Sequence, residues 1–296
     1  MIPWQARACA SFCLTVVGQV AGVALRRPGA SVLPLLRRHE PAPDPPPALL
    51  GSRGAGGARI VAVLHCHFVD VLPDLLRALE TIPEPFDLLI TTTSDLALPA
   101  ALPDLATSVR ILRVDNRGRD ILPLLRLVNA GLLDDCEVVC KVHTKKSTWR
   151  RGSVRFAGGG AEWRDELVRG ILGSPELVVA VLRAFESDPG LAMVTAPGQV
   201  LGPPYWGANI PLVLALGRRG RIAVDPGRLR FAAGSMYWAR SDVLRRLGDL
   251  RLRAAHFDSE RGQDDGTTAH AVERYLGYLA TSVGTIVTTD ELVGRG

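Results

Sequence analysis

The chain has 296 residues, of which 47% are hydrophobic and 22% are charged, so it supports one large or two small globular cores and excludes general disorder, collagen and coiled coil. The formal net charge of +5 favours an anionic ligand without requiring one. Only 5% of residues are aromatic and no basic run is interleaved with them, so a surface for nucleic acid is not expected.

Residues 1–58 are predicted to lie outside the main domain. Residues 9–25 are apolar, but they include a glutamine and two glycines and fall short of both a signal peptide and a membrane span. A helix lying on a membrane surface or on its own domain is the favoured interpretation, with a leader or a true span as alternatives. Residues 40–57 are rich in proline and glycine, which predicts a linker that does not pack.

From residue 59 the sequence alternates between strands and helices. Short apolar runs predict strands at 59–65, 86–93, 109–115 and 136–143, with helical patterns at 71–79 and 120–132. Strands separated by helices indicate right-handed crossovers and a parallel sheet with helices on both faces. The prediction is an α/β, Rossmann-like domain over 59–296, in which ligands bind beyond the carboxyl ends of the strands.

The second half is less regular and has no repeat of fixed period. Helices are expected at 161–172, 175–186, 210–216 and 268–282, and strands at 191–196 and 230–239. In the last of these strands Gly234 and Ser235 interrupt an apolar run. This break indicates either close approach of a ligand to the backbone or a packed core strand.

Polar residues follow each of the first four predicted strands. His65 and His67 come first, and they face the same way because alternate residues of an extended chain share a face. They would suit a metal pair, but no third ligand at characteristic spacing accompanies them. We therefore predict no metal site from these two residues.

The lysines of the chain are confined to one strand end. Lys141, Lys145 and Lys146 are the only three among 35 basic residues, and His143 and Thr144 stand between them. Compact ammonium groups beside hydroxyl groups suit a phosphate or diphosphate, as point charges where a metal would otherwise sit. The alternative is a solvated basic loop.

The segment from Asn116 to Asp120 is typical of a turn that enters a helix. Gly118 permits unusual backbone angles, Asp120 can cap the helix, and free N–H groups beside Arg119 offer an anion site. A capped and salt-bridged turn is the alternative.

An acidic cluster precedes the last predicted helix. It contains Asp258, Glu260, Asp264 and Asp265, and a glycine turn follows it. A carboxylate opposite a diphosphate site is what an acceptor hydroxyl needs for deprotonation as it attacks an anomeric carbon. Helix capping alone is the competing interpretation.

Taken in order, these motifs resemble the rhamnan synthesis protein F family. The resemblance runs from about residue 59 to 284 and rests on FDLLITT, NRGRDILPLL, KVHTKKS, EWRDEL, WGAN, FAAGSMYWAR and DDGTTAHAVER. It implies a GT-A-like glycosyltransferase that moves a deoxyhexose, L-rhamnose from dTDP-rhamnose, with inversion. The product would belong to bacterial cell-wall, capsule or O-antigen (lipopolysaccharide) polysaccharide.

The resemblance also implies which residues act as base, bind the donor and bind the acceptor. The expected base is Asp265, with Glu260 and Asp264 as alternatives. The expected donor and diphosphate ligands are His65, His67, Asn116, Gly118, Arg119, Asp120, Lys141, His143, Thr144, Lys145, Lys146, Gly234, Ser235 and His270. The expected acceptor ligands are Trp163, Arg164, Trp206 and Asn209.

The strand end at 141–145 departs from the family's fold. GT-A enzymes usually carry a DxD metal motif there, and this sequence has no aspartate at that place. We therefore expect no required cofactor, and leave binding of Mg or Mn open.

The expected partners are a nucleotide sugar and a lipid-linked glycan, with peripheral membrane contact and no nucleic acid. Five cysteines without a CxxC pair indicate reduced thiols, which agrees with a cytoplasmic protein at the inner face of the plasma membrane. A non-catalytic glycan-binding or scaffold module is the main alternative. A phosphotransferase is disfavoured because no GxxxxGK[ST] loop exists.

Overall fold

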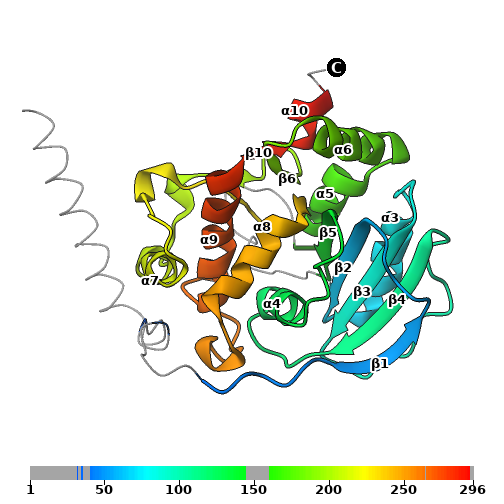
Figure 1. Cartoon of the computed structure of the whole chain (residues 1–296), viewed down its shortest axis with the longest axis horizontal. Helices are drawn as coiled ribbons and strands as arrows, with labels where there is room; N and C mark the ends of the chain where they lie inside the picture. Colours follow the sequence, from blue (N-terminus) through cyan, green and yellow to red (C-terminus); the bar gives the residue numbers. More distant parts are fainter. Residues whose placement is uncertain (1–31, 33–34, 36–40, 145–159, 264, 294–296) are drawn as a thin grey trace, which may run out of the picture.

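The structure is a computed structural model that describes residues 32, 35, 41–144, 160–263 and 265–293 (Figure 1). The predictions made for residues 9–25, Lys145, Lys146 and Asp264 lie outside the described residues.

A mixed sheet forms the centre of the fold. Its eight strands are β1 (Ala48–Arg53), β2 (Ile60–Cys66), β3 (Phe86–Thr92), β4 (Ala106–Arg113), β5 (Val138–His143), β6 (Leu191–Thr195), β9 (Tyr237–Arg240) and β10 (Thr285–Thr288). Their order across the sheet is β1-β4-β3-β2-β5-β9-β6-β10. Pairing is parallel along β4-β3-β2-β5 and between β6 and β10, whereas β9 and β1 run antiparallel to their neighbours. The predicted α/β, mostly parallel architecture is confirmed.

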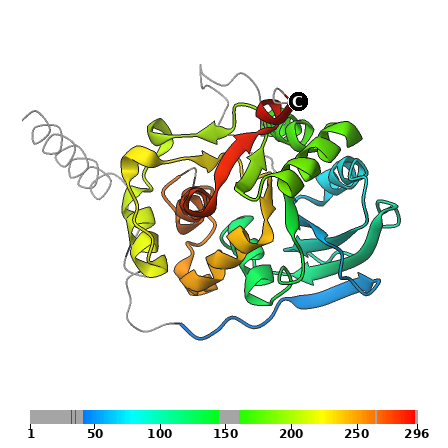
Figure 2. The same ribbon diagram turned by 45° about the horizontal axis from the view of Figure 1, so that its top comes forward.

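Helices cover both faces of the sheet (Figures 1 and 2). They are α3 (Leu72–Leu79), α4 (Ile121–Asn129), α5 (Gly160–Leu172), α6 (Pro175–Ser187), α7 (Ile210–Gly220), α8 (Ser241–Arg245), α9 (Thr268–Val283) and α10 (Thr289–Val293). Along β2, Val61 and Val63 pack with α4, α7, α8 and α9, while Ile60, Ala62 and Leu64 pack with α3, α5 and α6. Burial on both faces explains why β2 is a continuous apolar run. Within the described ranges, no helix is long and apolar enough to cross a bilayer.

Short elements complete the second half. β7 (Val200–Leu201) and β8 (Phe231–Ala232) pair antiparallel outside the main sheet. Single-turn 3-10 helices lie at Val69–Val71, Pro203–Tyr205, Pro226–Arg228, Arg246–Leu250 and Ala254–His256. The strand predicted at 230–239 is thus two strands, β8 and β9. Gly234 and Ser235 between them both have positive φ, at 87° and 58°, and therefore form a turn.

The segment before β2 packs against the domain, so the prediction that all of residues 40–57 form a non-packing linker is wrong. β1 pairs with the outer edge of β4 through residues 48–53. Its side chains are exposed, with Leu49 58% accessible, which is why no buried apolar pattern marks it in the sequence. Upstream, Asp44 forms an ion pair of 2.8 Å with Arg126 of α4 and accepts a hydrogen bond of 3.0 Å from the amide of Ala254.

We expect Asp44→Ala to lower the free energy of unfolding by about 2–4 kcal/mol, because it leaves the buried Arg126 guanidinium without its carboxylate. Urea unfolding measures the loss. Asp74→Ala is the matched control, since it removes an exposed ion pair with Arg77, and we expect it to cost under about 0.5 kcal/mol. Equal losses in the two variants would contradict a docked N-terminal segment.

Candidate functional site

The residues predicted at the strand ends meet at one edge of the sheet. β2, β3 and β5 are parallel and in register, so that His65 stands opposite Thr91 on one side and opposite His143 on the other. The turn between β8 and β9 and the start of α9 lie against the same edge, through the contacts described below. This is the edge where ligands bind in sheets of this kind.

A buried ammonium group lies at the centre of this edge. Lys141 of β5 is 1% exposed, and its Nζ donates to Asp120 Oδ2 at 2.5 Å and to the carbonyl and hydroxyl oxygens of Ser235 at 2.8 and 2.9 Å. These three acceptors match the three protons of an ammonium group. Lys141 therefore joins β5 to the start of α4 and to the β8–β9 turn, whereas the sequence predicted that it binds a diphosphate directly.

The partner carboxylate of Lys141 is ionised in the folded protein. Burial acts to raise the pKa of Asp120, but the charges of His143 and Lys141 hold it well below its usual value. Asp120 begins α4 without a side-chain capping bond, so its role is to pair with Lys141 rather than to cap the helix.

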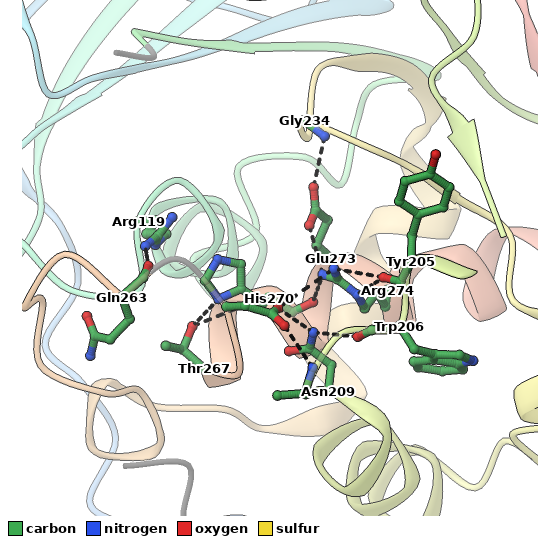
Figure 3. A network of polar contacts seen from close by, with 12 residues as sticks. Arg119, Tyr205, Trp206, Asn209, Gly234, Gln263, Thr267, His270, Glu273 and Arg274 are labelled. Carbon is green, nitrogen blue, oxygen red and sulfur yellow. Dashed lines mark hydrogen bonds and ion pairs between the residues drawn. The ribbon is translucent and has the colours of Figure 1, made fainter. Parts of the chain in front are cut away.

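The β8–β9 turn is held from two further directions. The Nε2 of His143 lies 2.9 Å from the carbonyl oxygen of Gly234 and must donate to it, because a carbonyl only accepts. The amide of Gly234 donates to Glu273 Oε1 of α9 at 3.0 Å, and Glu273 also forms an ion pair of 3.3 Å with Arg274 (Figure 3). A Cβ at Gly234 would lie 2.6 Å from Leu167, so the close packing of the turn requires glycine.

The two histidines after β2 are engaged by threonines. The Nδ1 atoms of His65 and His67 lie 3.0 and 3.1 Å from the hydroxyls of Thr91 and Thr93. Burial lowers the pKa of His65 to about 3, with the charge of Asp120 acting against this shift and the charges of His143 and Lys141 acting with it. The ring of His65 is therefore neutral at pH 7. In the described parts of the chain, no group of three or more His, Cys, Asp or Glu side chains is placed to hold a metal ion.

Thr144 stabilises the end of β2. Its Oγ1 accepts hydrogen bonds of 2.9 and 2.8 Å from the amides of His67 and Phe68. The hydroxyl predicted to bind the donor thus fixes the loop that follows the strand. Lys145 and Lys146 come directly after it in sequence.

The fold brings the predicted anion turn and the acidic cluster together. Gly118 and Arg119 have positive φ, at 65° and 55°, and the Arg119 amide donates to Glu260 Oε1 at 3.2 Å. The Arg119 guanidinium also donates to the carbonyl of Gln263 (Figure 3). Asn116 is exposed beside this turn. Two segments 140 residues apart, which the sequence assigned to donor and acceptor chemistry, are therefore in direct contact.

Asp265 is tightly held. Its Oδ2 accepts from the Ala208 amide at 2.7 Å, its Oδ1 accepts from the Asn209 side-chain amide at 2.6 Å, and Arg274 lies 3.8 Å away. Burial acts to raise the pKa of Asp265, but these donors and the Arg274 charge hold it below its usual value. A carboxylate stabilised in this way is a weaker base than a free one.

The other members of the cluster are placed differently. Asp258 Oδ2 accepts from the Thr268 amide at 2.9 Å and so caps α9. Glu260 is partly exposed, and within the described part of the chain its carboxylate contacts Arg119, through the amide at 3.2 Å and the guanidinium at 3.9 Å. His270 lies in the first turn of α9, with its Nδ1 2.8 Å from the Thr267 hydroxyl.

The residues predicted to bind the acceptor are largely buried. Trp206 is 6% exposed and donates to the Pro226 carbonyl at 2.8 Å, while Asn209 is 0% exposed and holds Asp265. Trp163 and Arg164 are also buried, and Trp163 donates to Gln199 at 3.2 Å. Burial prevents broad contact of these side chains with a glycan, and the bonds of Trp163, Trp206 and Asn209 go to other parts of the protein.

Two residues of this edge were not among the predicted site residues. Glu273 accepts the hydrogen bond of the Gly234 amide. It stands three residues after His270, so the two share one helix face, and this spacing could have indicated that Glu273 also faces the site. Tyr237 is fully buried, and its hydroxyl has no hydrogen-bond partner among the described residues. Burial and the charges of Asp120 and Glu273 raise the pKa of Tyr237 well above its usual value. Its aromatic run in the sequence resembles ordinary core, so nothing there indicated a polar contact.

Comparison with known proteins agrees with the site's motifs. Residues 52–284 match the family described as rhamnan synthesis protein F. Two proteins from strains of Xanthomonas campestris pv. campestris, each named Uncharacterized protein WxcX, are 40% identical over 234 residues, or 77% of this chain. The aligned part is 32% of each, so the chain spans about a third of the length of these relatives.

We expect Lys141→Met to destabilise the fold by about 3–5 kcal/mol, because it leaves Asp120 as a buried carboxylate without its cation. Adding Asp120→Asn should recover part of that loss, since the charge is then gone. Thermal and urea unfolding of the single and double variants measure the coupling. Additive losses would show that the two side chains act independently.

Stability should also fall on mild acidification because of His65. Its pKa is about 3 in the fold and about 6.5 when unfolded, so between these values the unfolded state binds more protons and stability rises with pH. From pH 6.5 to 5, His65 should cost about 1.6 kcal/mol, because the slope rises from half of about 1.36 kcal/mol per pH unit at the unfolded pKa to nearly the full value at pH 5. His65→Asn should flatten the pH profile by that amount. If His65→Asn instead changed the free energy of unfolding by the same amount at every pH, the pH dependence would not come from His65.

Proposed function

Because the chain belongs to the rhamnan synthesis protein F family, we propose that it is a glycosyltransferase that moves a deoxyhexose from a nucleoside diphosphate to a polysaccharide precursor. The proposed sugar is L-rhamnose and the proposed donor is dTDP-rhamnose. The proposed acceptor is a lipid-linked cell-wall, capsule or O-antigen glycan, reached at the inner face of the membrane.

One observation carries the proposal. The turn from Asn116 to Asp120 and the acidic segment from Asp258 to Asp265 meet through Arg119 at the carboxyl edge of a parallel sheet. Transfer with inversion needs a cationic site for the departing diphosphate and a carboxylate on the opposite side of the sugar. This contact brings the carboxylate of Glu260 to the edge of the sheet at which β5 ends, shortly before Lys145 and Lys146 in the sequence.

We assign the leaving diphosphate to the cations around the end of β5. Lys141 is saturated by its protein acceptors and acts as a positioning residue for Asp120 and Ser235. Lys145 and Lys146 would then neutralise the charge that develops on the diphosphate, with no divalent ion in the proposal. Arg119, whose guanidinium lies 3.9 Å from Glu260, would orient that carboxylate.

We assign the general base to Glu260 rather than to Asp265. Each carboxylate has an arginine at about the same distance, Arg274 at 3.8 Å from Asp265 and Arg119 at 3.9 Å from Glu260. Both oxygens of Asp265 also accept hydrogen bonds and its pKa is lowered, whereas Glu260 accepts one backbone amide bond and stays partly open to solvent. The acceptor hydroxyl, with a pKa far above 7, loses its proton to the base as the anomeric carbon gains positive charge. Asp265 would hold residues 207–209 in place.

We expect Glu260→Gln to lower kcat by about 10²- to 10⁴-fold while the Kd for dTDP stays within a factor of two, because general-base catalysis supplies a factor of this size. Turnover of dTDP-rhamnose and calorimetric titration with dTDP measure the two quantities. Asp265→Asn is the matched control, and it should lower Tm because its amide cannot accept from both Ala208 and Asn209.

Opposite behaviour of the two variants would place the base at Asp265. If Glu260→Gln and Asp265→Asn were both fully active, the acidic cluster would have only a structural role in capping α9. Binding of dTDP without turnover of any nucleotide sugar by the wild-type protein would favour a glycan-binding module over an enzyme. The product should be α-linked from a β-linked donor, and retention would exclude single displacement.

A further inference from the structure

A second concave site lies away from the carboxyl edge of β2 to β5. It is a cavity of about 730 Å³ between β7, the segment after α7, the 3-10 helix at 226–228 and the C-terminal end of α9. In Figure 1 the segment after α7 (yellow) stands beside the C-terminal end of α9 (red). The volume lies within the range of pockets that bind small molecules.

The floor of the cavity is apolar. It is formed by buried and half-buried hydrocarbon side chains, among them Val200, Leu201, Leu229 and the ring of Tyr278. The Tyr278 hydroxyl already donates to the Asp225 carbonyl at 2.5 Å, so the ring presents carbon atoms to the space. Such a floor favours a hydrocarbon chain over a polar ligand.

The rim of the cavity is cationic. Residues 218–230 contain five arginines and a single carboxylate, and Arg218, Arg221, Arg228 and Arg230 are exposed. Arg228 and Arg230 line the cavity itself. The Arg228 side chain is 84% exposed, with its Nε 3.9 Å from Asp225, and one Arg230 nitrogen donates to the Ile286 carbonyl at 3.4 Å. Each guanidinium has further N–H groups for a phosphate.

The cavity is joined to the candidate active site by a short strand. Leu229 and Arg230 lead through β8 to Gly234, whose carbonyl accepts from His143. Gly234 is four residues after Arg230, so at most about 13 Å of extended chain joins them. One short segment therefore joins the arginines at the rim to the turn that His143 holds.

We propose that this cavity binds an anionic amphiphile, with a phosphate or diphosphate head at Arg228 and Arg230 and a hydrocarbon chain on the apolar floor. Resting on the proposed function, this ligand is the lipid end of the acceptor. The site holds the acceptor lipid while its sugar reaches the edge of the sheet.

The test is calorimetric titration of the full chain with farnesyl diphosphate below its micelle concentration. Inorganic diphosphate and farnesol are compared, since each carries only one half of the proposed ligand. The double variant Arg228→Ala/Arg230→Ala removes the cations, and Ala223→Trp fills the cavity from an exposed lining position that tolerates a larger side chain. Arg183→Ala, on the exposed face of α6, is the matched control.

We expect farnesyl diphosphate to bind at least tenfold more tightly than either half ligand. We expect the double arginine variant and Ala223→Trp each to weaken it at least tenfold, and Arg183→Ala to leave it unchanged. Equal binding to wild type and both cavity variants would overturn the proposal. Binding of inorganic diphosphate as tight as that of farnesyl diphosphate would overturn it too, because the apolar floor would then have no role.

Titration with dTDP separates this inference from the proposed function. The cavity variants should bind dTDP as the wild type does, because the cavity is distinct from the edge of β5. Binding of dTDP without farnesyl diphosphate would defeat only the cavity assignment. Binding of farnesyl diphosphate without dTDP would defeat the proposed transferase and leave a lipid-binding module.

Discussion

The buried charge of Lys141 is the constraint on which the arrangement of this edge depends. An ammonium group removed from water is costly unless every proton finds an acceptor, and its three acceptors come from α4 and from the β8–β9 turn. The start of α4 and the β8–β9 turn must therefore both lie close to Lys141 of β5, which fixes their positions relative to each other. The positive φ of Ser235 is part of the same requirement, since it aims both oxygens of that residue at Nζ.

The turn at Gly234 connects the residues around Lys141 to α9. Glu273 accepts from the Gly234 amide, and Arg274 beside it reaches toward Asp265 and binds the Tyr205 carbonyl (Figure 3). The same helix begins where Asp258 caps it. A displacement at the cationic end of the site would thus be transmitted to the acidic segment through direct hydrogen bonds rather than through loosely packed side chains.

The sequence predicted the parallel strands well because burial on both faces leaves a continuous apolar run, as in β2 and β5. It could not predict β1, whose side chains are exposed and whose stability comes from backbone pairing with β4. For the site, the sequence identified chemically capable residues but not their partners. Lys141 is cationic in any fold, yet only the structure shows that protein acceptors use all its protons. Trp206 and Asn209 share motifs with the family, and a motif does not reveal that both are buried.

The docked segment at Asp44 has a consequence for folding during synthesis. Its partner amide at Ala254 follows 210 residues later, which at about 5–20 residues per second takes roughly 10–40 seconds to emerge from a ribosome. Until then the segment around Asp44 lacks its contact with Ala254, so β1, which follows it, covers the outer edge of β4 less stably. An uncovered strand edge is a template for pairing with other chains, so the nascent protein passes through an interval in which aggregation competes with its own completion.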